Sequence, residues 1–176
     1  MSPNKGNLNR GVYKKVPSAG FIVYRQTKDG PKFLIMYHRG GYWNFPKGRI
    51  EHMENSTETA LRELEEETGL KPAEVKIKNN FKTHETFKFT VGAEKIQKVV
   101  TLYLAETTKK GIDISRGDKE EGFGWFLYRD ARKLFTNYRE SQTVLRKASN
   151  FIRGKPHYHQ KKPSAKPLPQ RFAKRT

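Results

Sequence analysis

Seven glutamates lie between positions 51 and 67, and the spacing of Glu63, Glu66 and Glu67 could support chemistry. On a helix, residues three and four positions apart share a face, so these carboxylates should converge and repel one another. A divalent cation would turn that repulsion into attraction, because carboxylate oxygens suit hard ions such as Mg²⁺ or Mn²⁺ that also bind phosphates. The alternative is a solvated acidic helix face with surface ion pairs.

The same stretch carries side chains that would orient these carboxylates. Arg62 is four residues from both Glu58 and Glu66, so it is expected to pair with either and hold a carboxylate in one rotamer. The opposite helix face carries the apolar side chains that would seat the helix on a sheet, namely Ala60, Leu61 and Leu64.

The glutamates belong to a longer pattern, Gly-x5-Glu-x7-Arg-Glu-aliphatic-x-Glu-Glu-x-Gly-aliphatic. All nine specified positions are filled, by Gly48, Glu54, Arg62, Glu63, Leu64, Glu66, Glu67, Gly69 and Leu70. The stretch resembles the signature of the Nudix hydrolases, and the resemblance extends over most of residues 17–152. It implies an α/β/α sandwich with a mixed β-sheet, and hydrolysis of a nucleoside diphosphate linked to another group.

The resemblance also implies roles for individual residues. The ligands of Mg²⁺ (or Mn²⁺) would be Glu63, Glu66, Glu67 and the backbone carbonyl of Lys47. Arg62 would orient its neighbour, and Glu54 would support the site from its edge. The general base would be Glu66, Glu67 or a carboxylate outside the signature. For that last case Glu121 is favoured, because some family members place an extra ligand or base there; a solvated loop charge is the alternative.

Substrate contacts are expected from outside the helix. The segment Trp43-Asn44-Phe45-Pro46-Lys47-Gly48 is similar to one in the diadenosine tetraphosphate hydrolase branch, which cuts dinucleoside polyphosphates asymmetrically. Lys47 would place its charge on a phosphate. His38 is a second candidate for a phosphate contact, unless it is only a partly buried polar residue. Candidates for stacking on a base, with core packing as the alternative, are Trp43, Tyr42, Tyr103 and Phe87.

Alternate residues of a predicted strand, Lys82, His84 and Lys88, share one face. That face would line a phosphate channel or, alternatively, be solvated.

Apolar periodicity around the signature predicts the elements that position it. Strands are expected over residues 19–24, 32–37, 75–91, 95–106 and 124–128, and helices over 55–68, 130–135 and 139–153. Strands and helices mix without strict βαβ alternation, which favours an α+β or mixed α/β layered domain.

The length of 176 residues predicts one domain, over residues 17–152, with basic tails at 1–16 and 153–176. The net charge is +18, and twelve of these charges lie in residues 1–20 and 153–176. RNA contact through the tails is therefore expected. The chain has no cysteine, which excludes a disulfide framework and a thiol nucleophile. Without a long apolar run, we expect a cytoplasmic protein that does not enter a membrane.

These observations predict a metal-dependent pyrophosphohydrolase that cleaves a dinucleoside polyphosphate such as diadenosine tetraphosphate. Two alternatives stay open. One is removal of pyrophosphate from RNA 5′ ends, which the basic tails favour. The other is a nucleic-acid or ribosome-associated binding module that keeps the fold.

Overall fold

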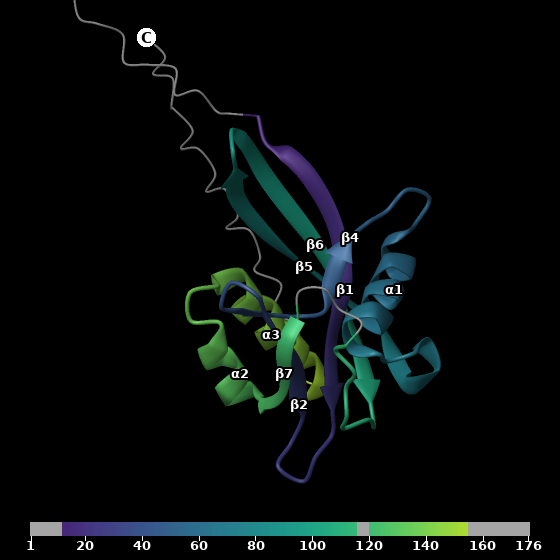
Figure 1. The fold of residues 1–176 in the computed structure, drawn as a ribbon. Helices are drawn as coiled ribbons and strands as arrows, with labels where there is room; N and C mark the ends of the chain where they lie inside the picture. Colours follow the sequence, from purple (N-terminus) through teal and green to yellow (C-terminus); the bar gives the residue numbers. More distant parts are fainter. Residues whose placement is uncertain (1–11, 116–119, 155–176) are drawn as a thin grey trace, which may run out of the picture.

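A mixed β-sheet with helices on both faces forms the part of the chain that the computed structural model describes, residues 12–115 and 120–154 (Figure 1). Its strands are β1 (Lys14–Arg25), β2 (Lys32–His38), β3 (Tyr42–Asn44), β4 (Lys47–Arg49), β5 (Val75–Val91), β6 (Glu94–Thr107) and β7 (Glu120–Leu127). The main strand order is β3-β2-β1-β6-β5, while β4 pairs with β1 and β7 pairs with β2. The predicted sandwich with a mixed sheet is confirmed.

Strand β1 organises the sheet because it has three partners. It runs parallel to β6 from Lys14 to Tyr24 and antiparallel to β2 at its end. The short strand β4 pairs antiparallel with residues 18–20 of β1, and this pairing brings Lys47 and Gly48 beside the middle of the sheet.

The helices are α1 (Ser56–Thr68), α2 (Tyr128–Leu134) and α3 (Arg139–Ile152), and a short 3₁₀ turn, η1, covers Pro72–Glu74. Helix α1 packs on one face of the sheet through Ala60 and Leu64. Helices α2 and α3 cover the other face, where Phe135 and Leu145 join a second apolar cluster. Figure 1 shows the sheet between these two layers. The packing of Ala60 and Leu64 on the sheet thus determines which side of α1 faces away from it.

The ends of α1 are determined by local sequence. Asn55 caps the helix by accepting hydrogen bonds from two backbone N–H groups, and Glu58 completes a capping box by accepting from the N–H of Asn55. Gly69 ends the helix with φ 68°, a left-handed conformation that glycine adopts without strain. Glu58 is therefore occupied by the cap and does not pair with Arg62 in the way that its spacing allowed.

Several elements differ from their predicted bounds. Strand β1 begins at Lys14 and β7 at Glu120, both earlier than expected, because the pairing of β1 with β6 and of β7 with β2 extends to these residues. The strands β3 and β4 and the turn η1 were not predicted, since three residues are too few for a periodic pattern. Residues 14–16, assigned to the N-terminal tail, belong to β1; the predicted tails otherwise fall largely outside the described residues.

Among residues 12–115 and 120–154, no helix is long and apolar enough to cross a membrane.

Candidate active site

Two adjacent cavities lie beside β4 and the end of the β5–β6 hairpin. The smaller, of about 470 Å³, is lined by polar groups that include Lys47, Gly48, Glu63 and Glu67. The larger, of about 700 Å³, is lined mainly by aromatic and polar side chains from β3, β5 and the start of α3. Tyr42, Lys47, Phe89 and Lys98 line both. The two cavities therefore meet at a pair of lysines.

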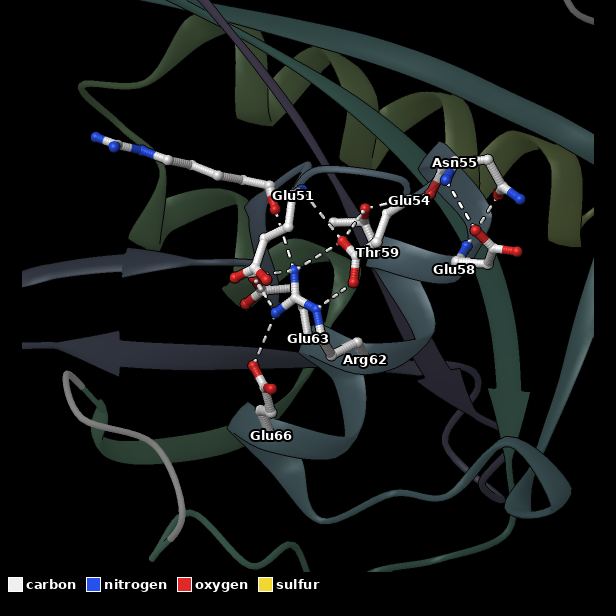
Figure 2. Close-up of polar contacts among 9 residues, drawn as sticks. Glu51, Glu54, Asn55, Glu58, Thr59, Arg62, Glu63 and Glu66 are labelled. Carbon is white, nitrogen blue, oxygen red and sulfur yellow. Dashed lines mark hydrogen bonds and ion pairs between the residues drawn. The ribbon is translucent and has the colours of Figure 1, made fainter.

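Arg62 connects the carboxylates of the signature, as Figure 2 shows. Its Nε lies 2.6 Å from Glu54 Oε1, and a second nitrogen lies 3.1 Å from Glu54 Oε2, so the pair is bidentate. Another nitrogen donates to Glu63 Oε1 and to Glu66 Oε2, each at 2.9 Å. A further bond, to the carbonyl oxygen of Arg49, anchors the guanidinium to β4. Arg62 thus holds three carboxylates and the loop before α1 in one arrangement.

This network changes the acidity of its members. Hydrogen bonds from Arg62 and then Thr59 lower the pKa of Glu54 to about 2. The same contact with Glu54 raises the pKa of Arg62. Burial instead raises the pKa of Glu63, although Arg62 opposes that shift. Glu63 is therefore a partly buried carboxylate whose charge needs a cation beside it.

Gly48 creates the space in which Glu63 lies. A Cβ atom at position 48 would overlap the carboxylate of Glu63, so any other residue here would displace it. Beside it, Glu67 Oε2 accepts a hydrogen bond of 3.0 Å from the backbone N–H of Lys47. The close packing of a carboxylate against a glycine backbone, with a second carboxylate next to it, supplies oxygen ligands of the kind that hard divalent cations prefer. These residues fit a magnesium or manganese ion.

The predicted trio does not form a ready-made ligand cluster. In the described ranges, no three acidic or histidine side chains gather closely enough to hold a metal ion. Glu66 points toward Arg62 and its side chain is 55% exposed, whereas Glu63 is partly buried and Glu67 is turned to β4. The guanidinium of Arg62 therefore already neutralises Glu63 and Glu66, which a bound cation would otherwise do. Ion binding would require at least Glu66 to reorient.

Two lysines stand between the cavities. The side chain of Lys47 is mostly buried, and its Nζ lies 3.5 Å from the carbonyl oxygen of Phe45. Burial, reinforced by the charge of Lys47, lowers the pKa of Lys98 to about 8. A partly dehydrated pair of ammonium groups attracts a polyanion strongly, because binding costs them little further hydration. The sequence pattern did not assign Lys98 a role.

Glu85 is a second residue, after Lys98, that sequence reasoning missed. It lies on β5 with 1% of its surface exposed and accepts a hydrogen bond of 2.9 Å from Ser141 of α3. Its other oxygen, Oε1, is buried with no hydrogen-bond partner in the described part of the chain. Burial raises the pKa of Glu85, while the charges of Lys47 and Lys98 oppose the rise. The sequence pattern of a strand does not show that a glutamate in it is buried. The burial of Glu85 becomes visible only in the structure, where α3 packs against β5.

The aromatic residues divide between the site and the rest of the fold. Tyr42, Trp43 and Phe87 line the larger cavity, together with Phe89 and Tyr138, which had not been predicted. Tyr103 does not line either cavity. Its hydroxyl lies 2.7 Å from Ser56 Oγ, so it fastens the start of α1 instead.

Other predicted residues lie beside or away from the cavities. His38 lines the smaller cavity and stacks on Tyr42 with ring centroids 5.0 Å apart. Glu121 lines neither cavity; it is half exposed and faces Arg39 at 3.7 Å. Of the predicted phosphate face, Lys88 lines the larger cavity. Lys82 and His84 line neither cavity; they contact Tyr103 and Thr101 of β6 on the α1 side of the sheet.

Comparison with known proteins identifies this arrangement. The family model described as NUDIX domain matches residues 14–148, which contain both cavities' carboxylates and lysines. The chain belongs to the Nudix family. It is a hydrolase that acts on phosphoric anhydrides, and Nudix hydrolases generally use divalent metal ions.

Relatives of this Nudix hydrolase cover most of its length. It is 28% identical over 143 residues to the asymmetrical bis(5′-nucleosyl)-tetraphosphatase of Mus musculus, an alignment that covers 77% of this chain and 94% of the relative. The crystal structure of a C. elegans Ap4A hydrolase binary complex superposes with a TM-score of 0.68 at 27% identity, covering 79% of this chain and 98% of that one. A shorter match, 39% identical over 61 residues, is to the RNA pyrophosphohydrolase of Stenotrophomonas maltophilia (strain K279a) and covers 35% of this chain and 29% of that relative.

Proposed function

We propose that this Nudix hydrolase cleaves dinucleoside polyphosphates such as diadenosine tetraphosphate. The observation that carries the proposal is the pair of cavities that meet at Lys47 and Lys98, one lined by carboxylates and the other by aromatic rings. A dinucleoside polyphosphate has a long anionic chain with a base at each end, so it offers a partner to both cavities. The relatives named as tetraphosphatases support the same substrate class.

The larger cavity suits a nucleoside. Trp43 and Phe87 present partly buried rings there, and Tyr138 at the start of α3 is 39% exposed. A base stacked on such rings gains apolar contact without needing a particular pattern of hydrogen bonds. The phosphate chain would then pass between the two lysines toward Glu63 and Glu67.

We also propose that Mg²⁺ or Mn²⁺ is held by the side chains of Glu63, Glu66 and Glu67 and by the backbone carbonyl of Lys47. When bound, the ion supplies positive charge that neutralises the phosphate oxygens in the transition state. Arg62 keeps Glu63 in position against Gly48, and its contact with Glu66 is the one that ion binding would exchange.

The residues of the chain would then carry out two tasks. Lys47 and Lys98 bind and orient the polyphosphate. Glu66 or Glu67 accepts a proton from the attacking water, whose oxygen bonds to phosphorus as the bridging P–O bond breaks. The electron pair of that bond leaves on the departing phosphate oxygen. Because Glu121 faces Arg39 outside the cavities, we consider it a weaker candidate for the general base than Glu66 or Glu67.

The proposal is tested by a substrate panel with Mg²⁺ that contains diadenosine tetraphosphate, nucleoside triphosphates, nucleotide sugars and 5′-triphosphorylated RNA. Diadenosine tetraphosphate should have the highest kcat/KM. Glu66→Gln and Glu67→Gln should each lower the rate by about 100-fold or more. The matched control is Glu65→Gln, which removes the same charge from the same helix and should keep the rate. No cleavage of any of these compounds would disprove the proposal.

Removal of pyrophosphate from RNA 5′ ends is a second candidate, favoured by the net charge of +18 and by the match to an RNA pyrophosphohydrolase. That match covers only 61 residues, whereas those to the tetraphosphatases cover more than twice as many. A higher kcat/KM for triphosphorylated RNA than for diadenosine tetraphosphate would favour it. Steeply salt-dependent RNA binding with negligible hydrolysis would instead favour a binding module.

A further inference from the structure

The strands β1, β5 and β6 extend beyond the helices, as Figure 1 shows, so no helix covers one end of this three-stranded region. On the α3 side, Phe89, Ile96 and Lys98 face the cavities of the proposed active site. The other side of the same strands has no part in the proposed hydrolysis. It is the side on which α1 packs farther along the sheet.

The register of the strands defines the residues of this second face, because paired residues project to the same side and alternate along each strand. From β5 and β6 they are Lys82, His84, Thr86, Lys88, Thr90, Lys95, Gln97, Val99, Thr101 and Tyr103, and from β1 they are Lys15 and Pro17. None of them is acidic. We call this set the lysine face.

Contacts across the strands confirm that these side chains share a side. The Nζ of Lys82 lies 5.7 Å from the ring centre of Tyr103. The Nζ of Lys88 lies 5.2 Å from the ring centre of Tyr13, which places this residue, 38% exposed, at the edge of the lysine face. Two tyrosine rings thus lie beneath ammonium groups on an open sheet.

The charges of the lysine face are not balanced by acidic groups. Within the described residues, Lys15, Lys82, Lys88 and Lys95 make no ion pair with an aspartate or glutamate. Lys14, which projects to the opposite face, does pair with Glu94 at 3.4 Å. Ammonium groups that share one face without carboxylates repel one another and create a positive potential that an extended polyanion would relieve.

We propose that the lysine face binds single-stranded nucleic acid. The lysines would contact phosphates, and the exposed ring of Tyr13 would contact a base, the combination by which open sheets hold single strands. From Lys82 to Thr90 the face is on the order of 25 Å long, at about 3.3 Å per strand residue, which is enough for several nucleotides. This inference does not depend on the proposed substrate, because Lys15, Lys82 and Lys95 line neither cavity, although Thr86 and Lys88 border the larger one.

The test is binding of a fluorescently labelled single-stranded RNA of about 12 nucleotides, within the range of sheet-based sites. A 5′-hydroxyl end keeps it from being a substrate for removal of pyrophosphate. The full chain is compared with the triple variant Lys15→Gln, Lys82→Gln and Lys95→Gln. The matched control, Lys28→Gln, Lys71→Gln and Lys133→Gln, removes three exposed charges elsewhere. Both variants keep residues 1–11 and 155–176 unchanged, so the charges there cannot account for a difference between them.

The lysine-face variant should bind RNA at least tenfold more weakly than the full chain, and its log Kd against log salt should lose a slope of about 2, at ~0.7 per phosphate contact. The control variant should bind within about twofold. Tyr13→Leu should weaken binding with the salt slope unchanged, since stacking releases no counterions. Circular dichroism and thermal unfolding should be the same for all of these proteins.

Three outcomes would overturn the proposal: an equal loss in both triple variants, binding of duplex RNA as tight as that of the single strand, or stronger binding to anionic phospholipid vesicles or polyglutamate than to RNA with the same lysine dependence. Hydrolysis of diadenosine tetraphosphate is measured in parallel. It should be unchanged in the lysine-face variant, so failure of this proposal and failure of the proposed function are distinguishable.

Discussion

At the scale of single residues, the buried Glu85 is the feature that stability alone does not explain. Its side chain is 1% exposed, and one of its oxygens has no hydrogen-bond partner in the described part of the chain. Burying a carboxylate in this way opposes folding. Because Lys47 and Lys98 stand nearby, we infer that its negative charge keeps the two ammonium groups in position for the phosphate chain.

Replacing Glu85 by glutamine tests this inference. Since burial raises the pKa of Glu85 above its ordinary 4.5, the wild-type fold loses stability as the pH rises through that pKa, and the amide does not. Glu85→Gln should therefore be at least as stable as wild type at pH 8, while kcat/KM falls about tenfold. Urea unfolding at pH 4 and pH 8, together with steady-state kinetics, measures both. A variant that loses more stability at pH 8 than at pH 4 would contradict the assignment.

Gly48 provides a second test at this scale. A methyl group at this position would overlap the carboxylate of Glu63, which is the far end of a flexible side chain and can move. Gly48→Ala should therefore remain folded, need more Mg²⁺ for half-maximal rate, and lose at least tenfold in kcat, since a displacement of about 1 Å in a site has such effects. A magnesium titration of the rate is the measurement. An unchanged magnesium dependence would show that Glu63 does not have to lie against Gly48 for the ion to bind.

At the scale of elements, helix α1 and the loop before it are linked by Arg62 and Glu54. Hydrogen bonds from Arg62 lower the pKa of Glu54 from 4.5 to about 2. A carboxylate with a lowered pKa contributes stability above its unfolded value, and the contribution disappears as the pH falls through the folded value.

Glu54→Gln should therefore be less stable than wild type at pH 7, and the difference should shrink between pH 4.5 and pH 2. Urea unfolding with a chelator present, across this range, keeps metal binding out of the comparison. A difference that stays constant with pH would mean that the charge of Glu54 does not contribute.

Helix α1 also indicates how far sequence reasoning reaches. Its start at Asn55, its end at Gly69 and its packing through Ala60 and Leu64 were all predictable, because capping residues and apolar spacing act locally. The partners of Arg62 were only partly predictable. The spacing allowed Glu58 and Glu66, whereas Glu54, which lies in the loop and has no fixed helical spacing, is the strongest partner in the structure.

At the scale of the whole molecule, the topology sets the relation between the two cavities. The parallel pairing of β1 with β6 and the antiparallel pairing of β1 with β4 bring Lys47 and Lys98 together, although they are far apart in sequence. No local pattern contains that information, which is why Lys98 and Glu85 were missed. The same register separates Lys82 and His84 from Lys98 and Phe87, so the positive charge of the hairpin is divided between two faces with different proposed ligands.

The most direct measurement of the central claim is the product analysis of diadenosine tetraphosphate incubated with the purified chain and Mg²⁺. If the carboxylates of α1 and the lysines between the cavities form the hydrolytic site, the substrate is cleaved; similarity to relatives named asymmetrical tetraphosphatases predicts ATP and AMP in equal amounts as the products. The rate of product formation should fall about 100-fold or more in Glu67→Gln and should equal the wild-type rate in Glu65→Gln. An intact substrate under these conditions, or an undiminished rate in Glu67→Gln, would contradict the account.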